Sequence, residues 1–179
     1  MSAPVDRGLD EEAGEPKYAR IELERRWRVD TTRRPALAGC PMTLIEDRYI
    51  DGTRLRLRRM TRADLGEVKC KLTKKYECNE ARARPIVTSY LTGPEYDRLV
   101  ALPAHGLIKR RHHFEHQGRW WSLDLFDGAL AGLELLECEA EDRRALDALT
   151  PPDWALHEVT DLPQWQGGAL SWAQAIPED

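Results

Sequence analysis

Charged and apolar residues alternate along several segments of the chain, which is the period of a β-strand with two different faces. In residues 21–29, IELERRWRV, two glutamates and an arginine occupy every second position. The same alternation recurs in 54–60, 67–76 and 107–114, and 133–139 adds two further alternating glutamates. The pattern therefore predicts five strands, each with one strongly charged face.

The remaining segments complete a protein that is mainly antiparallel β. Asp51-Gly52 is a strong signal for a tight hairpin turn between two strands. Short helices are expected where prolines mark a start or an end. The additional strands are predicted at 43–50, 84–92 and 119–126, the helices at 93–103 and 142–152, and a further helix in the tail at 165–176. The fold class predicted from these elements is α+β.

Composition indicates one globular domain. The chain has 179 residues, of which 41% are hydrophobic and 32% charged. Residues 1–17 are rich in Asp, Glu, Gly and Pro, so we expect a disordered leader there and one domain over 18–179. The absence of a signal peptide, a membrane span and a CxxC pair favours a cytoplasmic protein with reduced thiols. The net charge of −4 gives no reason to expect a membrane or nucleic acid as a partner.

Charges of opposite sign are segregated along the chain. Residues 54–75 contain nine Lys or Arg and two acids, whereas residues 134–142 contain five acids and no base. Two arrangements account for this. In a flat antiparallel sheet the charged faces meet solvent, and cross-strand pairs contribute about 0.2–1 kcal/mol each. In a barrel the charged faces point inward, which requires compensating charges and a highly charged ligand.

A charged interior of this kind suits a polyphosphate together with a divalent metal ion. Arg and Lys side chains on rigid strands offer planar forks and ammonium groups that match phosphate oxygens. Glutamates at i and i+2 point to the same side of a strand, as Glu22 and Glu24 do. Glu137 and Glu139 form a second such pair. Four carboxylates are hard ligands for Mg²⁺ or Mn²⁺. The chain has no Gly-rich phosphate loop, so it is not a P-loop enzyme.

Several short motifs together resemble one known family. IELERRW, RLRLR, KLTKK, IKRR, SLDLFDG, LLECEAE and EVT follow the order found in the CYTH superfamily, the triphosphate tunnel metalloenzymes, over most of residues 18–172. This resemblance implies a closed or nearly closed eight-stranded antiparallel β-barrel, a tunnel with a few peripheral helices. It also implies that the tunnel binds triphosphate groups with a divalent metal. Members include inorganic and thiamine triphosphatases, class IV adenylyl cyclases and RNA triphosphatases.

The resemblance also implies roles for individual residues. The metal ligands would be Glu22, Glu24, Glu137 and Glu139. The substrate-binding side chains would be Arg54, Arg56, Lys71, Lys75, Lys109 and Arg111. The candidates for the catalytic step are Arg26, Tyr49 and Lys75. The residues that share a face or motif with these, without an assigned task, are Arg58, Asp124 and Glu158.

Two departures from the family pattern bear on catalysis. The family often places a lysine from the first motif beside a tyrosine, a pair proposed to position or activate water. Here Tyr49 matches the tyrosine, but Arg26 replaces the lysine, and a guanidinium that stays protonated is a poor base. The family's middle strand commonly carries alternating glutamates, whereas residues 82–92, RARPIVTSYLT, contain no carboxylate.

The sequence favours metal-dependent hydrolysis of a triphosphate-containing small molecule by attack of water. Inorganic triphosphate, thiamine triphosphate and nucleotides are equally compatible substrates. Two alternatives stay open: a non-catalytic protein that binds polyphosphate or nucleotide, and a cyclase in which the ribose hydroxyl attacks instead of water. The oligomeric state is not indicated by the sequence.

Overall fold

The computed structural model describes residues 18–178, and the leader predicted at 1–17 lies outside them. The strands are β1 (Arg20–Val29), β2 (Met42–Ile50), β3 (Leu55–Arg62), β4 (Glu67–Lys75), β5 (Ala83–Leu91), β6 (Ala104–His116), β7 (Arg119–Phe126), β8 (Glu134–Glu139) and β9 (Ala155–Glu158). The helices are α1 (Gly93–Leu99), α2 (Arg143–Asp147) and α3 (Gly167–Leu170), with 3-10 turns η2 (Gly128–Leu130) and η3 (Pro163–Trp165).

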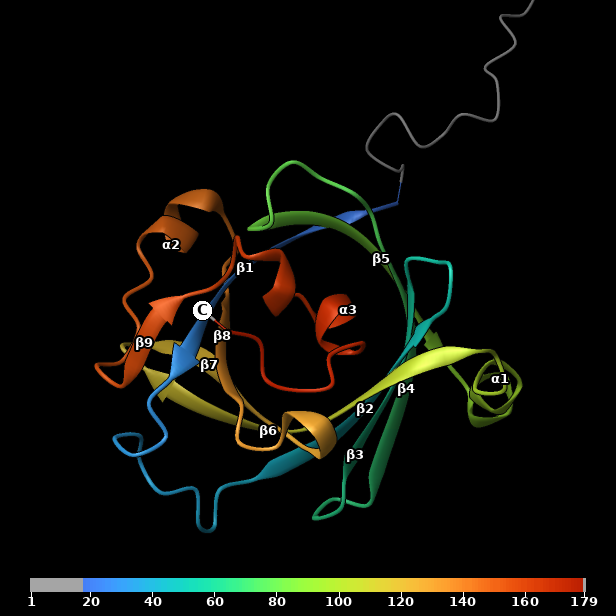
Figure 1. The fold of residues 1–179 in the computed structure, drawn as a ribbon, viewed down its shortest axis with the longest axis horizontal. Helices are drawn as coiled ribbons and strands as arrows, with labels where there is room; N and C mark the ends of the chain where they lie inside the picture. Colours follow the sequence, from blue (N-terminus) through green and yellow to red (C-terminus); the bar gives the residue numbers. More distant parts are fainter. Residues whose placement is uncertain (1–17, 179) are drawn as a thin grey trace, which may run out of the picture.

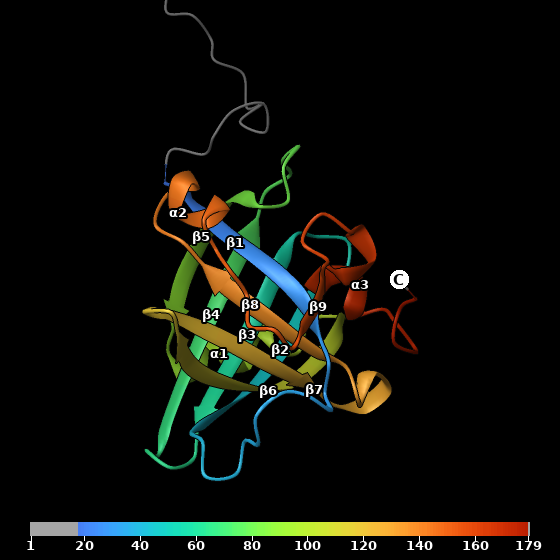
Figure 2. The ribbon, with the colours of Figure 1, turned by 90° about the vertical axis from the view of Figure 1, so that its left-hand side faces the viewer.

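Eight of the strands form a closed antiparallel barrel. Their order is β5-β4-β3-β2-β6-β7-β8-β1, and pairing between β1 and β5 closes the ring. The closing pair is short and places Glu22 opposite Arg84. Figure 1 shows the ring of strands viewed nearly along its opening, and Figure 2 shows the strands from the side. The predicted eight-stranded α+β barrel is confirmed.

The differences from the predicted elements lie mainly outside the barrel. The four-residue strand β9 pairs with β1 and was not predicted, because so short a run carries no readable alternation. The predicted helices are present but shorter, and the tail forms only the turn η3 and the four-residue helix α3. No helix within residues 18–178 is long and apolar enough to cross a membrane.

The apolar faces of the strands point outward, beneath the helices. Trp27 of β1 packs in a buried cluster with Trp121 of β7 and Leu146 of α2. On the other side of the ring, Leu57 of β3 packs with Tyr96 of α1. Since adjacent residues in a strand point to opposite faces, burial of these side chains outside the barrel directs the charged residues into it.

The C-terminal tail closes one end of the barrel. Figure 1 shows α3 inside the ring of strands, and Figure 2 shows it at one end of the ring. Trp165 of η3 and Leu170 of α3 are buried in a cluster with Leu107 and Leu135 from the barrel wall. Burial of these apolar side chains stabilises the tail in this position.

Candidate functional site

The charged strand faces point into the barrel, so the flat-sheet alternative is wrong. The pairing of β1 with β8 places Glu24 opposite Glu139 and Arg26 opposite Glu137. Residues opposite one another in adjacent strands share a face of the sheet. Trp27, the neighbour of Arg26 in sequence, lies in the outer apolar cluster, so Arg26 and the glutamates occupy the inner face.

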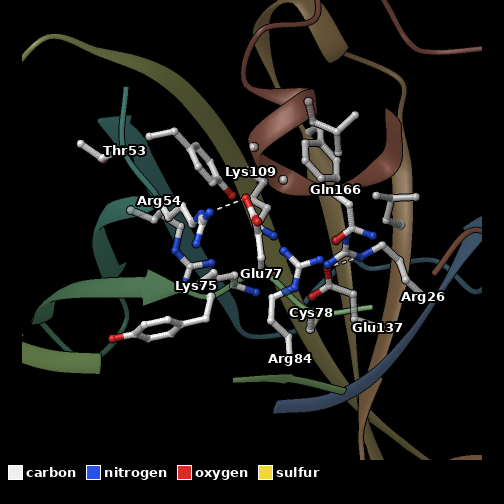
Figure 3. A pocket seen from close by; sticks show the side chains of 18 residues that line it. Arg26, Thr53, Arg54, Lys75, Glu77, Cys78, Arg84, Lys109, Glu137 and Gln166 are labelled. Carbon is white, nitrogen blue, oxygen red and sulfur yellow. Dashed lines mark ion pairs between the residues drawn. The ribbon is translucent and has the colours of Figure 1, made fainter. Parts of the chain in front are cut away.

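One cavity, here called the basic cavity, lies beside the tail and has a volume of about 340 Å³. Figure 3 shows arginine and lysine side chains from several strands around this space. The cationic residues that line it are Arg26, Arg54, Arg56, Lys75, Arg84 and Lys109. Cations this close together repel one another, so the cavity favours an anion with several negative charges.

A second cavity, here called the acidic mouth, has a volume of about 920 Å³. Glu24, Glu137 and Glu139 line it, together with Arg111 and the exposed Trp120. Glu137 also lines the basic cavity, so it lies between the two spaces. The barrel therefore brings the predicted metal glutamates next to the predicted phosphate-binding cations.

Three of the four glutamates predicted to bind metal form ion pairs with cations inside the barrel. Lys75 Nζ donates to Oε2 of Glu22 at 2.6 Å. Arg26 Nη2 donates to Oε1 of Glu24 at 3.0 Å, and Arg26 Nε lies 2.8 Å from Oε1 of Glu137. Burial raises the pKa of Glu137, but the positive charges of Arg26, Lys109, Arg111 and Arg58 together outweigh burial and hold that pKa well below its ordinary value. Glu137 is therefore ionised at neutral pH.

The glutamates fit a divalent metal by their chemistry and by the side of the sheet that they share. Burial raises the pKa of Glu139, and the nearby carboxylates of Glu22 and Glu24 raise it further. Such crowding of carboxylates favours a hard divalent cation among them. Within residues 18–178, however, no three His, Cys, Asp or Glu side chains are already placed to hold an ion. Glu22, Glu24 and Glu137 would have to turn from their present partners to bind one.

Asp124 is a buried anchor for two of the predicted phosphate ligands. Its side chain is fully buried and accepts hydrogen bonds from Lys109 Nζ and from Arg111 Nε and Nη2, the last two at 2.6 Å. Burial lowers the pKa of Lys109, whereas the charge of Asp124 opposes that effect. Asp124 therefore fixes the positions of both cations and favours the charged form of Lys109.

Arg58 of β3 is held by a similar anchor, Asp47 of the adjacent strand β2. Its Nε and Nη2 donate to the two carboxylate oxygens of Asp47 at 2.6 and 2.7 Å. Both residues are buried, and the bidentate geometry is the strongest arrangement for this pair. Arg58, left without a task by the sequence, is therefore part of the wall of the barrel.

We expect the Asp47 carboxylate to remain ionised down to about pH 3. Burial raises its pKa, but Arg58 and Arg56 outweigh burial and lower it from 3.8 to about 2. A depressed pKa in the folded state stabilises the protein above pH 3.8, and this contribution of roughly 2 kcal/mol is lost as the pH falls toward 2. A carboxyl-carbon NMR titration measures the pKa directly, and a midpoint near 4 would contradict the pairing.

Arg26 and Tyr49, two of the catalytic candidates, both lie beneath the tail. Arg26 Nη1 donates to the backbone carbonyl of Trp165 at 2.9 Å, so the tail holds one edge of the guanidinium. Burial lowers the pKa of Arg26, but Glu137 and Glu24 raise it above its ordinary value. Burial raises the pKa of Tyr49. At neutral pH the guanidinium is therefore charged and the phenol is protonated.

Of the remaining predicted residues, only some lie at the two cavities. Arg54 lines the basic cavity but pairs with the exposed Glu77, as Figure 3 shows. Lys71 lies on the inner face opposite Arg58 but lines neither the basic cavity nor the acidic mouth. Glu158 lies on the outer side of β1, where Arg25 donates to it at 2.6 and 3.1 Å. Glu158 therefore does not join the other candidates.

Three contributors were not predicted as site residues. Arg84 lines the basic cavity from β5, the strand that lacks carboxylates. Asp47 anchors Arg58, and its position between Ile45 and Tyr49 on one face of β2 was a signal that could have found it. The tail lines the basic cavity through Gln166, Gly167 and Gly168. No alternation or motif in the tail indicated that it enters the barrel.

Comparison with known proteins identifies the fold. No protein-family model and no curated protein sequence matches the chain. A solved structure of the inorganic triphosphatase NE1496 is 22% identical, with 88% of this chain and 97% of that chain covered and a TM-score of 0.56. The PH1819 protein from Pyrococcus horikoshii OT3 is 16% identical over 70% of this chain and 82% of that chain, with a TM-score of 0.53. The chain shares the barrel fold of these two proteins. At these identities the likeness establishes the fold alone.

Proposed function

We propose that this protein hydrolyses a substrate that carries a linear triphosphate, with Mg²⁺ or Mn²⁺ as its metal cofactor. The observation that supports this most directly is the basic cavity, where cationic side chains from five strands, together with Arg54 from the loop before β3, face one partly open space of about 340 Å³. Convergent guanidinium and ammonium groups are suited to a chain of phosphates. The fold shared with a protein described as an inorganic triphosphatase supports the same reaction.

In this proposal, hydrolysis is accelerated mainly by the positive charges and fixed positions of the side chains around the phosphates, and less by proton transfer to a side chain. A water molecule attacks the terminal phosphorus, and the bond from that phosphorus to the bridging oxygen breaks with its electron pair left on the bridging oxygen. One of the two water protons passes to a phosphate oxygen. Phosphoryl transfer spreads negative charge over the equatorial oxygens of the transition state. Fixed cations such as Arg56 and Lys109 would stabilise that charge without reorganisation. A bound divalent metal supplies further positive charge at the phosphates.

Arg26 and Tyr49 would position the substrate rather than accept a proton. Neither a charged guanidinium nor a phenol with a raised pKa is a base at neutral pH. Arg26 would donate to phosphate oxygens, and Tyr49, which lines the same cavity, would donate its hydroxyl hydrogen. The same observation favours the second candidate function, non-catalytic binding of polyphosphate, because neither Arg26 nor Tyr49, the two residues at the positions of the proposed catalytic pair, accepts a proton at neutral pH.

A release assay distinguishes these functions. Inorganic triphosphate, thiamine triphosphate and ATP are each incubated with the protein and Mg²⁺ or Mn²⁺, and orthophosphate and diphosphate are measured. We expect orthophosphate from at least one substrate with metal, and none in the presence of excess chelator. Binding of every substrate without release would establish the non-catalytic binder. Release of diphosphate with formation of a cyclic nucleotide from ATP would establish the cyclase.

A further inference from the structure

Two of the cations that pair with the glutamates, Lys75 and Arg26, also face the basic cavity. Lys75, which contacts Glu22, lines that cavity, and so does Arg26, which contacts Glu24 and Glu137. A nitrogen that donates to a phosphate oxygen in the cavity gives up all or part of its contact with the carboxylate. The two sets of predicted ligands are therefore linked through shared donors.

Because the same cations serve both ligands, binding of the metal without phosphate, or of phosphate without the metal, is penalised. A divalent metal that took the carboxylate of Glu22 would leave the ammonium of Lys75 without its partner among other cations. A phosphate that took Lys75 and Arg26 would leave the carboxylates of Glu22 and Glu24 partly buried and unpaired. An uncompensated charge in a partly buried site is costly, whichever its sign.

Binding of both ions together removes both penalties. Phosphate oxygens replace the carboxylates as partners of the cations, and the metal replaces the cations as partner of the carboxylates. We propose that triphosphate and divalent metal enter this tunnel cooperatively by exchanging ion-pair partners, with Lys75 and Arg26 as the exchanged cations. The inference rests on the proposed function, because it assumes the same phosphate and metal positions.

Cooperativity of this kind is reciprocal. If phosphate raises the affinity of the tunnel for the metal, the metal raises its affinity for phosphate by the same factor. Removing one exchanged cation should therefore strengthen metal binding to the phosphate-free protein and reduce the coupling between the two ligands. Arg26 has a further partner in the carbonyl of Trp165, so Lys75 is the cleaner residue to change.

The test compares Lys75→Met with Arg54→Met as the matched control. Both substitutions remove one positive charge from the basic cavity, so their effects on the general electrostatic field are similar. Only Lys75 contacts a glutamate of the metal set, because Arg54 pairs with Glu77, whose side chain is 82% exposed. Binding of Mn²⁺ to each folded protein is measured by calorimetry without any phosphate, after circular dichroism has shown that the variants are folded.

We expect Lys75→Met to raise Mn²⁺ affinity roughly tenfold, within the range of 5- to 150-fold typical of coupled sites. Arg54→Met should raise Mn²⁺ affinity less than about twofold, because the only effect of this substitution on the metal is the loss of a positive charge that solvent and salt screen. Equal increases in both variants, or none in Lys75→Met, would overturn the exchange of partners. Failure of the proposed function has a different signature, since it would show as absence of phosphate release by the wild-type protein and would leave the Mn²⁺ measurements unchanged.

Discussion

Asp124→Asn is expected to lower the free energy of unfolding by about 3–5 kcal/mol, which is the typical cost of removing one partner of a buried ion pair. The Asp124 side chain is fully buried and holds both Lys109 and Arg111. Asparagine is nearly the same size but has one acceptor oxygen and no charge. The substitution therefore leaves the buried Lys109 without the carboxylate that compensates it, and leaves Arg111 with Glu137 as its remaining acidic partner.

A matched control lies three residues further along the chain. Asp127 pairs with Arg110 at 2.9 Å, but the two side chains are 36% and 45% exposed. Asp127→Asn should therefore cost less than about 1 kcal/mol, as exposed ion pairs do. Urea denaturation of both variants at pH 7 gives the comparison. Equal losses for Asp124→Asn and Asp127→Asn would show that Asp124 is not a structural anchor.

The wall of the barrel could be predicted because its physical signal is local. A strand with a buried outer face and a charged inner face must alternate with period two, and five of the eight barrel strands display this alternation within a few residues. The glutamates of β1 and β8 were expected to converge although more than a hundred residues separate them, and the register places Glu24 opposite Glu139. The basic strands β3 and β4 lie across the ring from the acidic strand β8, so the inward-facing part of the segregated charges lies on opposite walls of the barrel.

The pairing of individual charges could not be predicted from the alternation. An inward carboxylate can bind a metal, accept from a substrate-binding cation or anchor the wall, and the sequence pattern is the same in each case. Asp124 and Asp47 are anchors, whereas Glu158 lies on the outer face with Arg25. These outcomes depend on which partner each carboxylate meets: Asp47 and Asp124 pair with the adjacent strand of a hairpin, whereas Glu158 pairs with Arg25, 133 positions away in the sequence. The tail was missed for the same reason, since its position depends on the cavity that receives it.

The contact between the tail and Tyr49 predicts opposite results for two adjacent glycines. A Cβ at Gly167 would lie 2.1 Å from Oη of Tyr49 and 3.2 Å from its Cζ, whereas one at Gly168 would make only ordinary contacts at 3.9 Å. Gly167→Ala must therefore push Tyr49 into the basic cavity or lift the tail from Arg26. Displacement of catalytic groups by about 1 Å lowers turnover by roughly 10²-fold. We expect that loss for Gly167→Ala and wild-type turnover for Gly168→Ala, measured by phosphate release.

A stability measurement makes this prediction independent of the proposed reaction. Gly167→Ala should reduce the free energy of unfolding by about 1–3 kcal/mol, as overpacking of a filled site does. Gly168→Ala should leave it unchanged or raise it slightly, because alanine favours the helical backbone of α3. Adding Tyr49→Phe to Gly167→Ala removes the oxygen at 2.1 Å and leaves the ring carbon at 3.2 Å, so most of the lost stability should return. If Tyr49→Phe restores nothing, the tail does not meet the hydroxyl of Tyr49, and the closed end of the barrel is arranged differently in solution.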